Sequence, residues 1–279
     1  MFATIGHTIE LMKMSWGVLR RDRELVAFPL MGLAGVLALV GVFGGVAWMT
    51  GALDRLLAAA DQESVRSMTA SDWALYVAFY FSAYFTGIFF NSALVAAALE
   101  RLRGGDPTVA SGLRVATSML PAILGWTLIA ATVGLILSAI RERSEGLLGR
   151  ILASLVEGVW AYITFFVIPV LVAEGVGPIE AIRRSGALFR QSWGRQFTAA
   201  FGFGLVYFLA VLAAIALSVV GFAIHPVVGI PVAVVSFAVA IGTVSALEGI
   251  FKAALYEYSV GGSPAGFDRG TLASAYRAL

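Results

Sequence analysis

The chain has 279 residues, of which 59% are hydrophobic, 13% are charged and none is cysteine, and its formal net charge is +2. Soluble domains carry about twice this share of charged residues, because their surface must be covered by polar groups. The composition therefore excludes an ordinary water-soluble protein. The lack of cysteine excludes disulfide bonds and thiol chemistry. The small net charge gives no reason to expect a nucleic acid as a partner.

Long uncharged runs predict six transmembrane helices. A helix needs about 20 apolar residues to cross the hydrocarbon core of a bilayer. Residues 25–53, 73–99 and 115–140 contain no charge, and 151–173 contain one. The run 196–247 is too long for one crossing, and a His-Pro step near its middle divides it into two helices. We therefore expect an all-α, polytopic membrane protein, because the strands of a membrane barrel would alternate polar and apolar residues.

Lysine and arginine predict the orientation of these helices. With the N-terminus inside the cell, the inner segments carry 13 of these residues and the outer loops carry five. Basic residues concentrate in the cytoplasmic segments of membrane proteins. The sequence therefore predicts a multi-pass protein of the cell (cytoplasmic) membrane, with both termini in the cytoplasm.

Similar short segments precede the predicted pairs of spans. Residues 8–17 (TIELMKMSWG) align with 185–194 (SGALFRQSWG), and both are amphipathic. Glycine and proline follow the second, fourth and sixth spans, as expected where one helix ends and the next begins. We expect a single domain over 1–279, built from three repeated units that each consist of an interfacial amphipathic helix and a transmembrane hairpin. The units are predicted at about 1–103, 104–175 and 176–260, followed by a C-terminal interfacial helix at 261–279.

Four segments of the chain resemble a known family. They are SWGVLRRDRELVAFPL, IFFNSALVAAALERLRGGDPTVASGLR, FFVIPVLVAEGVGPIEAIRRSGALFRQSWG and GIFKAALYEYS. They are similar to an uncharacterised family of six-span prokaryotic integral membrane proteins, a domain of unknown function. The repeated amphipathic helix is also loosely similar to the membrane region of some glycerophosphodiester phosphodiesterases, whose catalytic domain has no counterpart in this sequence. The resemblance implies a six-span fold and brings no functional residues with it.

Polar residues within the predicted spans are candidates for a site, because ionisable groups are costly inside a bilayer. Asn91 and Glu248 each lie 16 residues before the proline that follows their span, which places both near the midplane. Glu157 is expected nearer the outer side. Together with Lys252, these residues could surround a polar cavity for a solute, a proton or a lipid headgroup. Alternatively, Glu248 and Lys252 pair along one helix face, and Asn91 makes an interhelical hydrogen bond.

Other residues are assigned to the membrane surface and to helix packing. Trp16 and Trp193 are predicted interfacial anchors, and Gly41 and Gly45 form a GxxxG pair that lets helices approach closely. A basic cytoplasmic face is expected to attract anionic lipid headgroups or an acidic protein partner. It consists of Arg20, Arg21, Arg23, Arg101, Arg103, Arg183 and Arg184.

Two kinds of function remain open from the sequence. The first is a non-enzymatic membrane-organising protein or accessory subunit, as a homo-oligomer or in a complex with a membrane partner. The second is a small-solute, ion or lipid transporter or channel. The only two histidines, His7 and His225, lie far apart, and no close pair of acids occurs in a predicted span. We therefore expect no enzyme activity, no metal and no cofactor.

Overall fold

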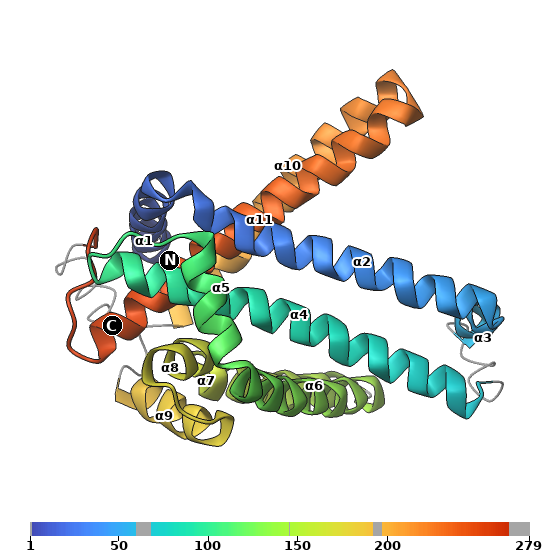
Figure 1. Ribbon diagram of the computed structural model, residues 1–279, viewed down its shortest axis with the longest axis horizontal. Helices are drawn as coiled ribbons and strands as arrows, with labels where there is room; N and C mark the ends of the chain where they lie inside the picture. Colours follow the sequence, from blue (N-terminus) through green and yellow to red (C-terminus); the bar gives the residue numbers. More distant parts are fainter. Residues whose placement is uncertain (1, 60–67, 145, 192–196, 268–279) are drawn as a thin grey trace.

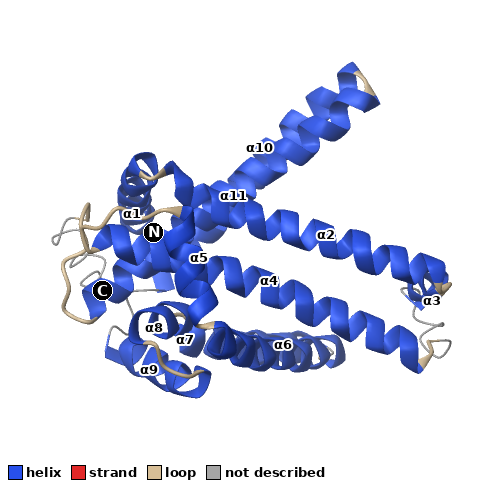
Figure 2. Cartoon of the chain, in the orientation of Figure 1, coloured by secondary structure: helices blue, strands red, loops and turns tan. Residues whose placement is uncertain are grey.

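The computed structural model describes residues 2–59, 68–144, 146–191 and 197–267. Within these residues every long regular element is a helix and no strand occurs (Figure 2). Six helical stretches of the described chain are long and apolar enough to cross a membrane, which confirms the predicted number of spans. They are Arg23–Met49, Ala70–Leu102, Leu120–Arg143, Leu148–Glu174, Val206–Ile224 and Pro226–Ser259.

The spans form three hairpins (Figure 1). The elements of the first hairpin, in chain order, are α1 (Phe2–Arg21), the 3-10 helix η1 (Arg23–Val26), α2 (Ala27–Met49), α3 (Ala52–Ala59) and α4 (Ala70–Leu102). The second comprises α5 (Val109–Ser118), α6 (Leu120–Arg143), α7 (Gly146–Thr164) and α8 (Val167–Glu174). The third comprises α9 (Pro178–Gln191), α10 (Phe197–Ile224) and α11 (Pro226–Ser259). A shorter helix thus precedes each hairpin, while common descent of the three units stays a prediction.

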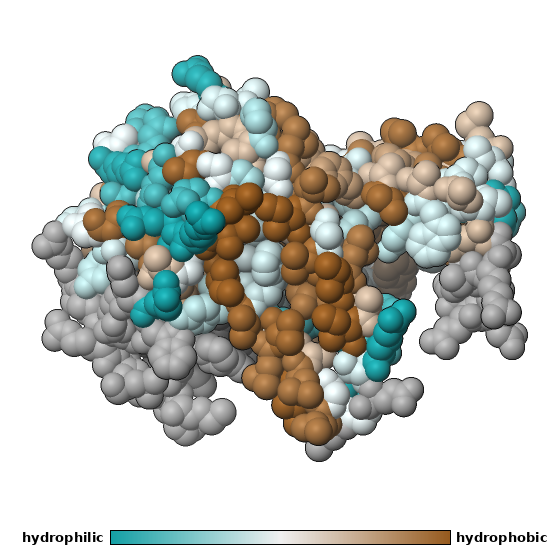
Figure 3. Space-filling view, turned by 90° about the horizontal axis from the view of Figure 1, so that it is seen from below, coloured by the Kyte–Doolittle hydropathy of each residue, from teal (hydrophilic) through white to brown (hydrophobic). Residues whose placement is uncertain are grey.

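The hairpins diverge from one end of the molecule, which we call the hub. The hub consists of α1, α5, α8 and α9, packed around the C-terminal halves of α4 and α11 (Figure 1). Most buried hydrophobic side chains lie there, including Phe28, Leu94, Phe166 and Phe251. Figure 3 shows hydrophilic side chains over the hub and hydrophobic ones over the middle of the molecule. The hub therefore supplies the protein core, and the arms present apolar surface to lipid.

Glycines end the spans that return to the hub. Gly104, Gly175 and Gly261 have φ values of 90°, 66° and 89°, a region that glycine adopts without steric cost. After α4, the N–H of Gly105 donates to the carbonyl of Glu100. After α11, the N–H of Gly262 donates to the carbonyl of Glu257 in the same way. This bond closes a Schellman motif. The predicted glycine stops are confirmed, and α4 and α11 end in the same way.

The segment after α11 differs from its prediction. Residues 261–267 form turns instead of an interfacial helix, and 268–279 lie outside the described residues. The N–H of Ala265 donates to the carbonyl of Leu102, with 2.8 Å between the atoms. This bond ties the segment to the end of α4, so that the glycine stop of α11 is followed by a return to the hub.

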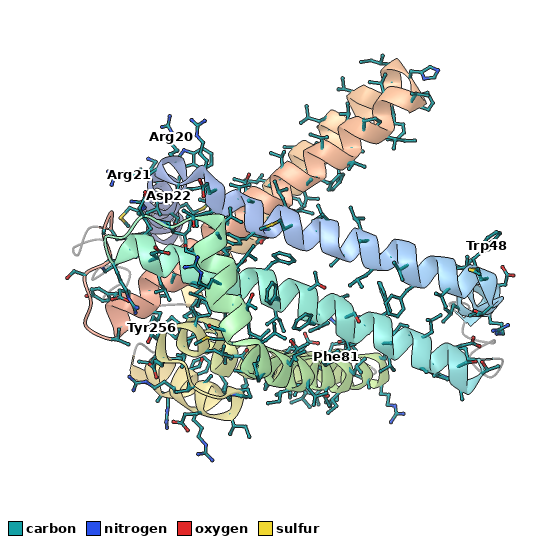
Figure 4. The ribbon with its side chains drawn as sticks, viewed as in Figure 1. Arg20, Arg21, Asp22, Trp48, Phe81 and Tyr256 are labelled. Carbon is teal, nitrogen blue, oxygen red and sulfur yellow. The ribbon has the colours of Figure 1, made fainter. Side chains whose placement is uncertain are left out.

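The far tip of the first hairpin is held by an ion pair. The Arg55 guanidinium donates two hydrogen bonds of 2.8 Å to the carboxylate of Asp72, whose side chain is 1% exposed. The bond to Asp72 raises the pKa of Arg55 above its usual value. Asp72 also accepts from the N–H of Thr69 in a capping box at the start of α4. The tip thus has a fixed charge-paired end, beside the exposed Trp48 (Figure 4).

Close helix contacts occur at glycines outside the predicted GxxxG pair. A Cβ on Gly35 of α2 would lie 2.8 Å from the Thr86 side chain of α4. A Cβ on Gly249 of α11 would lie 2.5 Å from the Leu94 side chain. Gly41 and Gly45 have no atom of another element within 4 Å of such a Cβ in the described chain. The GxxxG pair therefore makes no close helix contact within the described residues.

Candidate functional site

A cavity of about 380 Å³ lies between the second and third hairpins, beside the hub, with α4 as one wall. Polar side chains line it from four helices: Asn91 from α4, Thr164 from α7, Tyr207 from α10, and Glu248 and Lys252 from α11. Most of the remaining lining is apolar, including Trp126 of α6. The structure therefore brings together three of the four polar residues that the sequence singled out.

Glu248 and Lys252 form an ion pair on one face of α11. Their carboxylate oxygen and ammonium nitrogen are 2.7 Å apart, as the four-residue spacing predicts. Their side chains are 31% and 29% exposed, so neither charge is sealed inside the protein. The Lys252 ammonium also lies 5.4 Å from the centre of the Phe165 ring, within the range of a cation–π interaction. The cavity thus contains both a carboxylate and an ammonium group.

Asn91 occupies the same place on α4 as Glu248 does on α11. An offset of 157 residues relates the two positions, as it relates the glycine stops of the two helices. No hydrogen bond of the Asn91 amide is found within the described chain, so the predicted interhelical bond is absent there. The Tyr207 hydroxyl, by contrast, is 2.8 Å from the hydroxyl of Ser245. Within the described residues, Asn91 therefore has donors and an acceptor free for a ligand.

The fourth span is interrupted beside the cavity. α7 ends at Thr164 and α8 begins at Val167. Pro169 has no N–H for the carbonyl four residues earlier, and its ring clashes with that carbonyl. At the break, the N–H of Phe166 donates to the buried hydroxyl of Ser185 on α9, with 2.9 Å between the atoms. The break contributes four residues to the lining of the cavity: Thr164, Phe165, Ile168 and Pro169.

Glu157 lies apart from the other predicted site residues. Its carboxylate is 3.6 Å from the Arg141 guanidinium, which links α7 to α6, and Glu157 is not among the residues that line the cavity. Both side chains are more than one-third exposed: Arg141 is 65% exposed and Glu157 is 35% exposed. An exposed pair of this kind contributes little to stability, and it gives Glu157 a partner of its own.

The lengths of α4 and α11 bear on the depth of the site. α11 has 34 residues, so at 1.5 Å per residue it is about 51 Å long, well beyond the hydrocarbon core of about 30 Å. Glu248 lies about 33 Å along this helix from Pro226, and Asn91 lies about 32 Å along α4 from Ala70. The prediction that both residues lie near the midplane was counted from the other end of each span, back from the proline that follows it. Both residues therefore lie past the middle of their helices, on the side of the hub.

Four arginines of the predicted basic face are in ion pairs. Arg101 holds Asp22 through two of its nitrogens and lies 2.6 Å from Asp106. The other pairs are Arg103–Glu257 at 3.0 Å, Arg184–Glu174 at 3.1 Å and Arg183–Glu180 at 3.8 Å. The first three of these arginines join different elements of the hub. Their charges are therefore largely compensated within the protein.

Within the predicted basic face, the uncompensated side chains are on or next to α1. Arg20, Arg21 and Arg23 are exposed and have no ion-pair partner in the part of the chain that the structure describes. Figure 4 shows Arg20 and Arg21 pointing away from the body of the molecule. Trp16, on the same helix, is 46% exposed, whereas Trp193 lies outside the described residues. Leu19, three residues after Trp16, is 4% exposed because α1 packs on α10 and α11.

The sequence did not single out Tyr207 or Ser185 as part of the site. Tyr207 lies in a long charge-free run, where its aromatic ring reads as apolar. In the sequence, Ser185 stands out only because it aligns with Thr8 in the repeated segment. Its hydroxyl accepts from the N–H of Phe166, a contact between α9 and the start of α8 that has no local signal in the sequence.

Comparison with known proteins identifies the family of the chain but no characterised relative. The model of a family of unknown function, DUF6159, matches residues 70–267. No curated protein and no solved structure is found to match the chain, so the looser resemblance to phosphodiesterase membrane regions gains no support. The matched range contains α4 to α11 and every residue that lines the cavity. The chain belongs to the DUF6159 family of unknown function.

Proposed function

We propose that this chain is a non-enzymatic membrane protein that binds a small ligand in the cavity between its second and third hairpins, as transporters do. The supporting observation is that the Glu248–Lys252 ion pair, the free amide of Asn91 and the break in the fourth span meet at one cavity. Charged groups inside a membrane are costly and commonly functional. Interrupted helices form the binding sites of many transporters. A purely structural ion pair requires neither the amide nor the break.

The packing of the hairpins supports transport of the ligand rather than permanent binding. α10 packs mainly on α11 and α1, whereas α6 and α7 pack on each other and on α4 and α9. Within the described residues, no extensive contact joins α10 to α6 or α7. The third hairpin can therefore shift relative to the second about the hub, and such a shift changes the width of the cavity between them. Alternating access in transporters uses rigid movements of this kind.

The first test is native mass spectrometry of the protein extracted gently from its own membrane. We expect the wild type to carry a bound small molecule or lipid, and the double variant Asn91→Leu, Glu248→Gln to lose it, because both changes remove polar groups that line the cavity. Glu157→Gln is the matched control, since this carboxylate lies outside the cavity. A bound mass that is the same in wild type and double variant would contradict the proposed site.

A membrane-organising protein or accessory subunit is the second candidate. It is supported by the exposed, unpaired Arg20, Arg21 and Arg23 beside the exposed Trp16. Basic side chains near an anionic membrane surface contribute about 1 kcal/mol each to attraction. A stable additional protein mass in the same spectra, with no small ligand, would favour this function over the first.

We further propose that the hub faces the cytoplasm and that the protein lies in the cell membrane. The start of the first span and the end of the last both lie at the hub, where most of the arginines gather. The chain has no cysteine, so single cysteines can report the orientation. On intact cells, an impermeant maleimide should label Thr50→Cys at the exposed hairpin tip and not Ser118→Cys at the exposed end of α5. The opposite pattern would reverse the orientation.

A further inference from the structure

We infer that the cavity selects a zwitterionic ligand, one that carries both an ammonium group and an anionic phosphate or carboxylate group. This inference rests on the proposed function, because it names the ligand class of the same cavity. Among the described residues that line the cavity, Glu248 is the only acid and Lys252 the only base. The described part of the lining is therefore electrically neutral, yet it contains both signs of charge 2.7 Å apart.

Charge balance decides which ligands such a site accepts. A ligand with a net charge would bring an uncompensated charge into a weakly polar region, which is costly. A zwitterion avoids this cost. The internal ion pair can open so that Glu248 pairs with the ligand ammonium and Lys252 with the ligand anion. One ion pair is then replaced by two, and no charge is left alone.

The neutral lining residues suit the same ligand. The free Asn91 amide can donate a hydrogen bond to a phosphate or carboxylate oxygen, and such bonds to charged acceptors are strong. The rings of Trp126, Phe165 and Phe251 also line the cavity, and aromatic faces attract ammonium groups. Phe165 already lies 5.4 Å from the Lys252 ammonium. A volume of about 380 Å³ is ample for a headgroup or a small free solute.

Two sources offer this chemistry: a zwitterionic phospholipid headgroup and a free zwitterion in solution. Four probes separate them. Dihexanoyl phosphatidylethanolamine is a zwitterionic lipid, and dihexanoyl phosphatidylglycerol has the same chains and phosphate without the amine. Glycerophosphoethanolamine has the zwitterionic head without chains, and hexylammonium is a cation with one short chain. Each probe is titrated into the full chain in detergent, and its Kd is obtained from the shift in unfolding temperature.

We expect the wild type to bind phosphatidylethanolamine about tenfold or more tightly than phosphatidylglycerol and hexylammonium, since each of these leaves one charge of the site unmatched. Glycerophosphoethanolamine should bind with a similar Kd if the ligand is a free solute, and far more weakly if the ligand is a lipid. Tighter binding of phosphatidylglycerol or hexylammonium by the wild type would overturn the inference. The wild-type ratio decides even where a variant fails to fold.

Variants of the ion pair test the cause of the selectivity. Glu248→Gln makes the site cationic, and its preference should shift to phosphatidylglycerol. Lys252→Gln makes it anionic, and its preference should shift to hexylammonium. The charge-swapped double variant Glu248→Lys, Lys252→Glu stays neutral, so it should keep the wild-type order of affinities. Selectivity that is unchanged in both single variants would contradict a role for these charges.

The two proposals can fail separately. If native mass spectrometry finds a ligand that depends on Asn91 and Glu248 and has a net charge, the cavity still binds a ligand and only its zwitterionic selectivity is wrong. If no probe binds and no ligand is carried from the membrane, the proposed function is contradicted as well.

Discussion

Replacing Arg101 by methionine should lower the free energy of unfolding by about 3–5 kcal/mol, as expected when one partner of a buried ion pair is removed. Arg101 binds Asp22 through two nitrogens, and the Asp22 side chain is 7% exposed. Without the guanidinium, a nearly buried carboxylate keeps no ion-pair partner among the described residues. The second partner, Asp106, is 92% exposed, so its contribution is small because solvent screens it.

Unfolding in mixed detergent micelles measures this loss, and three further variants test its origin. Arg114→Met is the matched control: Arg114 is exposed, has no ion-pair partner among the described residues and should cost less than about 0.5 kcal/mol. Asp22→Asn added to Arg101→Met should recover part of the loss, because the stranded charge is removed. A double-mutant cycle with Asp22→Asn alone isolates the pair. An Arg101→Met variant as stable as Arg114→Met would show that the hub does not depend on this contact.

The features that could be predicted from the sequence are those that the lipid or the local backbone dictates. Runs with at most one charge that are long enough to cross the hydrocarbon core, together with the His-Pro step that divides the longest run, predict six spans. Glycine at a positive φ ends a helix in water or in lipid, so the helix ends at Gly104 and Gly261 could be predicted from the sequence. The four-residue spacing of Glu248 and Lys252 predicts their ion pair because one helix sets both positions.

Features that depend on contacts between distant segments could not be predicted. Asp22 and Arg101 are 79 residues apart, and in the sequence Asp22 stands within a run of arginines that reads as basic. Glu157 and Asn91 were grouped because both are polar residues in spans. Depth, however, does not fix the direction in which a helix points a side chain, and the structure places Glu157 against Arg141. The divergence of the third hairpin has no local signal at all.

Replacing Gly112 by alanine should destabilise the protein by about 1–3 kcal/mol or more, the cost of overpacking a core. A Cβ there would lie 2.6 Å from the Phe28 ring and 2.7 Å from the carbonyl oxygen of Ala93. The ring can turn aside, but the carbonyl belongs to the backbone of α4, so α5 would have to move away from it. This expectation opposes the usual gain of up to about 1 kcal/mol when alanine replaces glycine inside a helix.

Gly41→Ala is the matched control, because a Cβ at Gly41 has no atom of another element within 4 Å in the described chain. Its unfolding midpoint should stay the same or rise, while that of Gly112→Ala falls. Equal behaviour of the two variants would mean that α5 does not pack closely on α4. The consequence would reach the cavity, because α5 leads directly into α6, and α6 supplies Trp126 to the lining. A loss of stability in Gly112→Ala together with weaker ligand binding would therefore indicate that the packing of the hub sets the shape of the cavity.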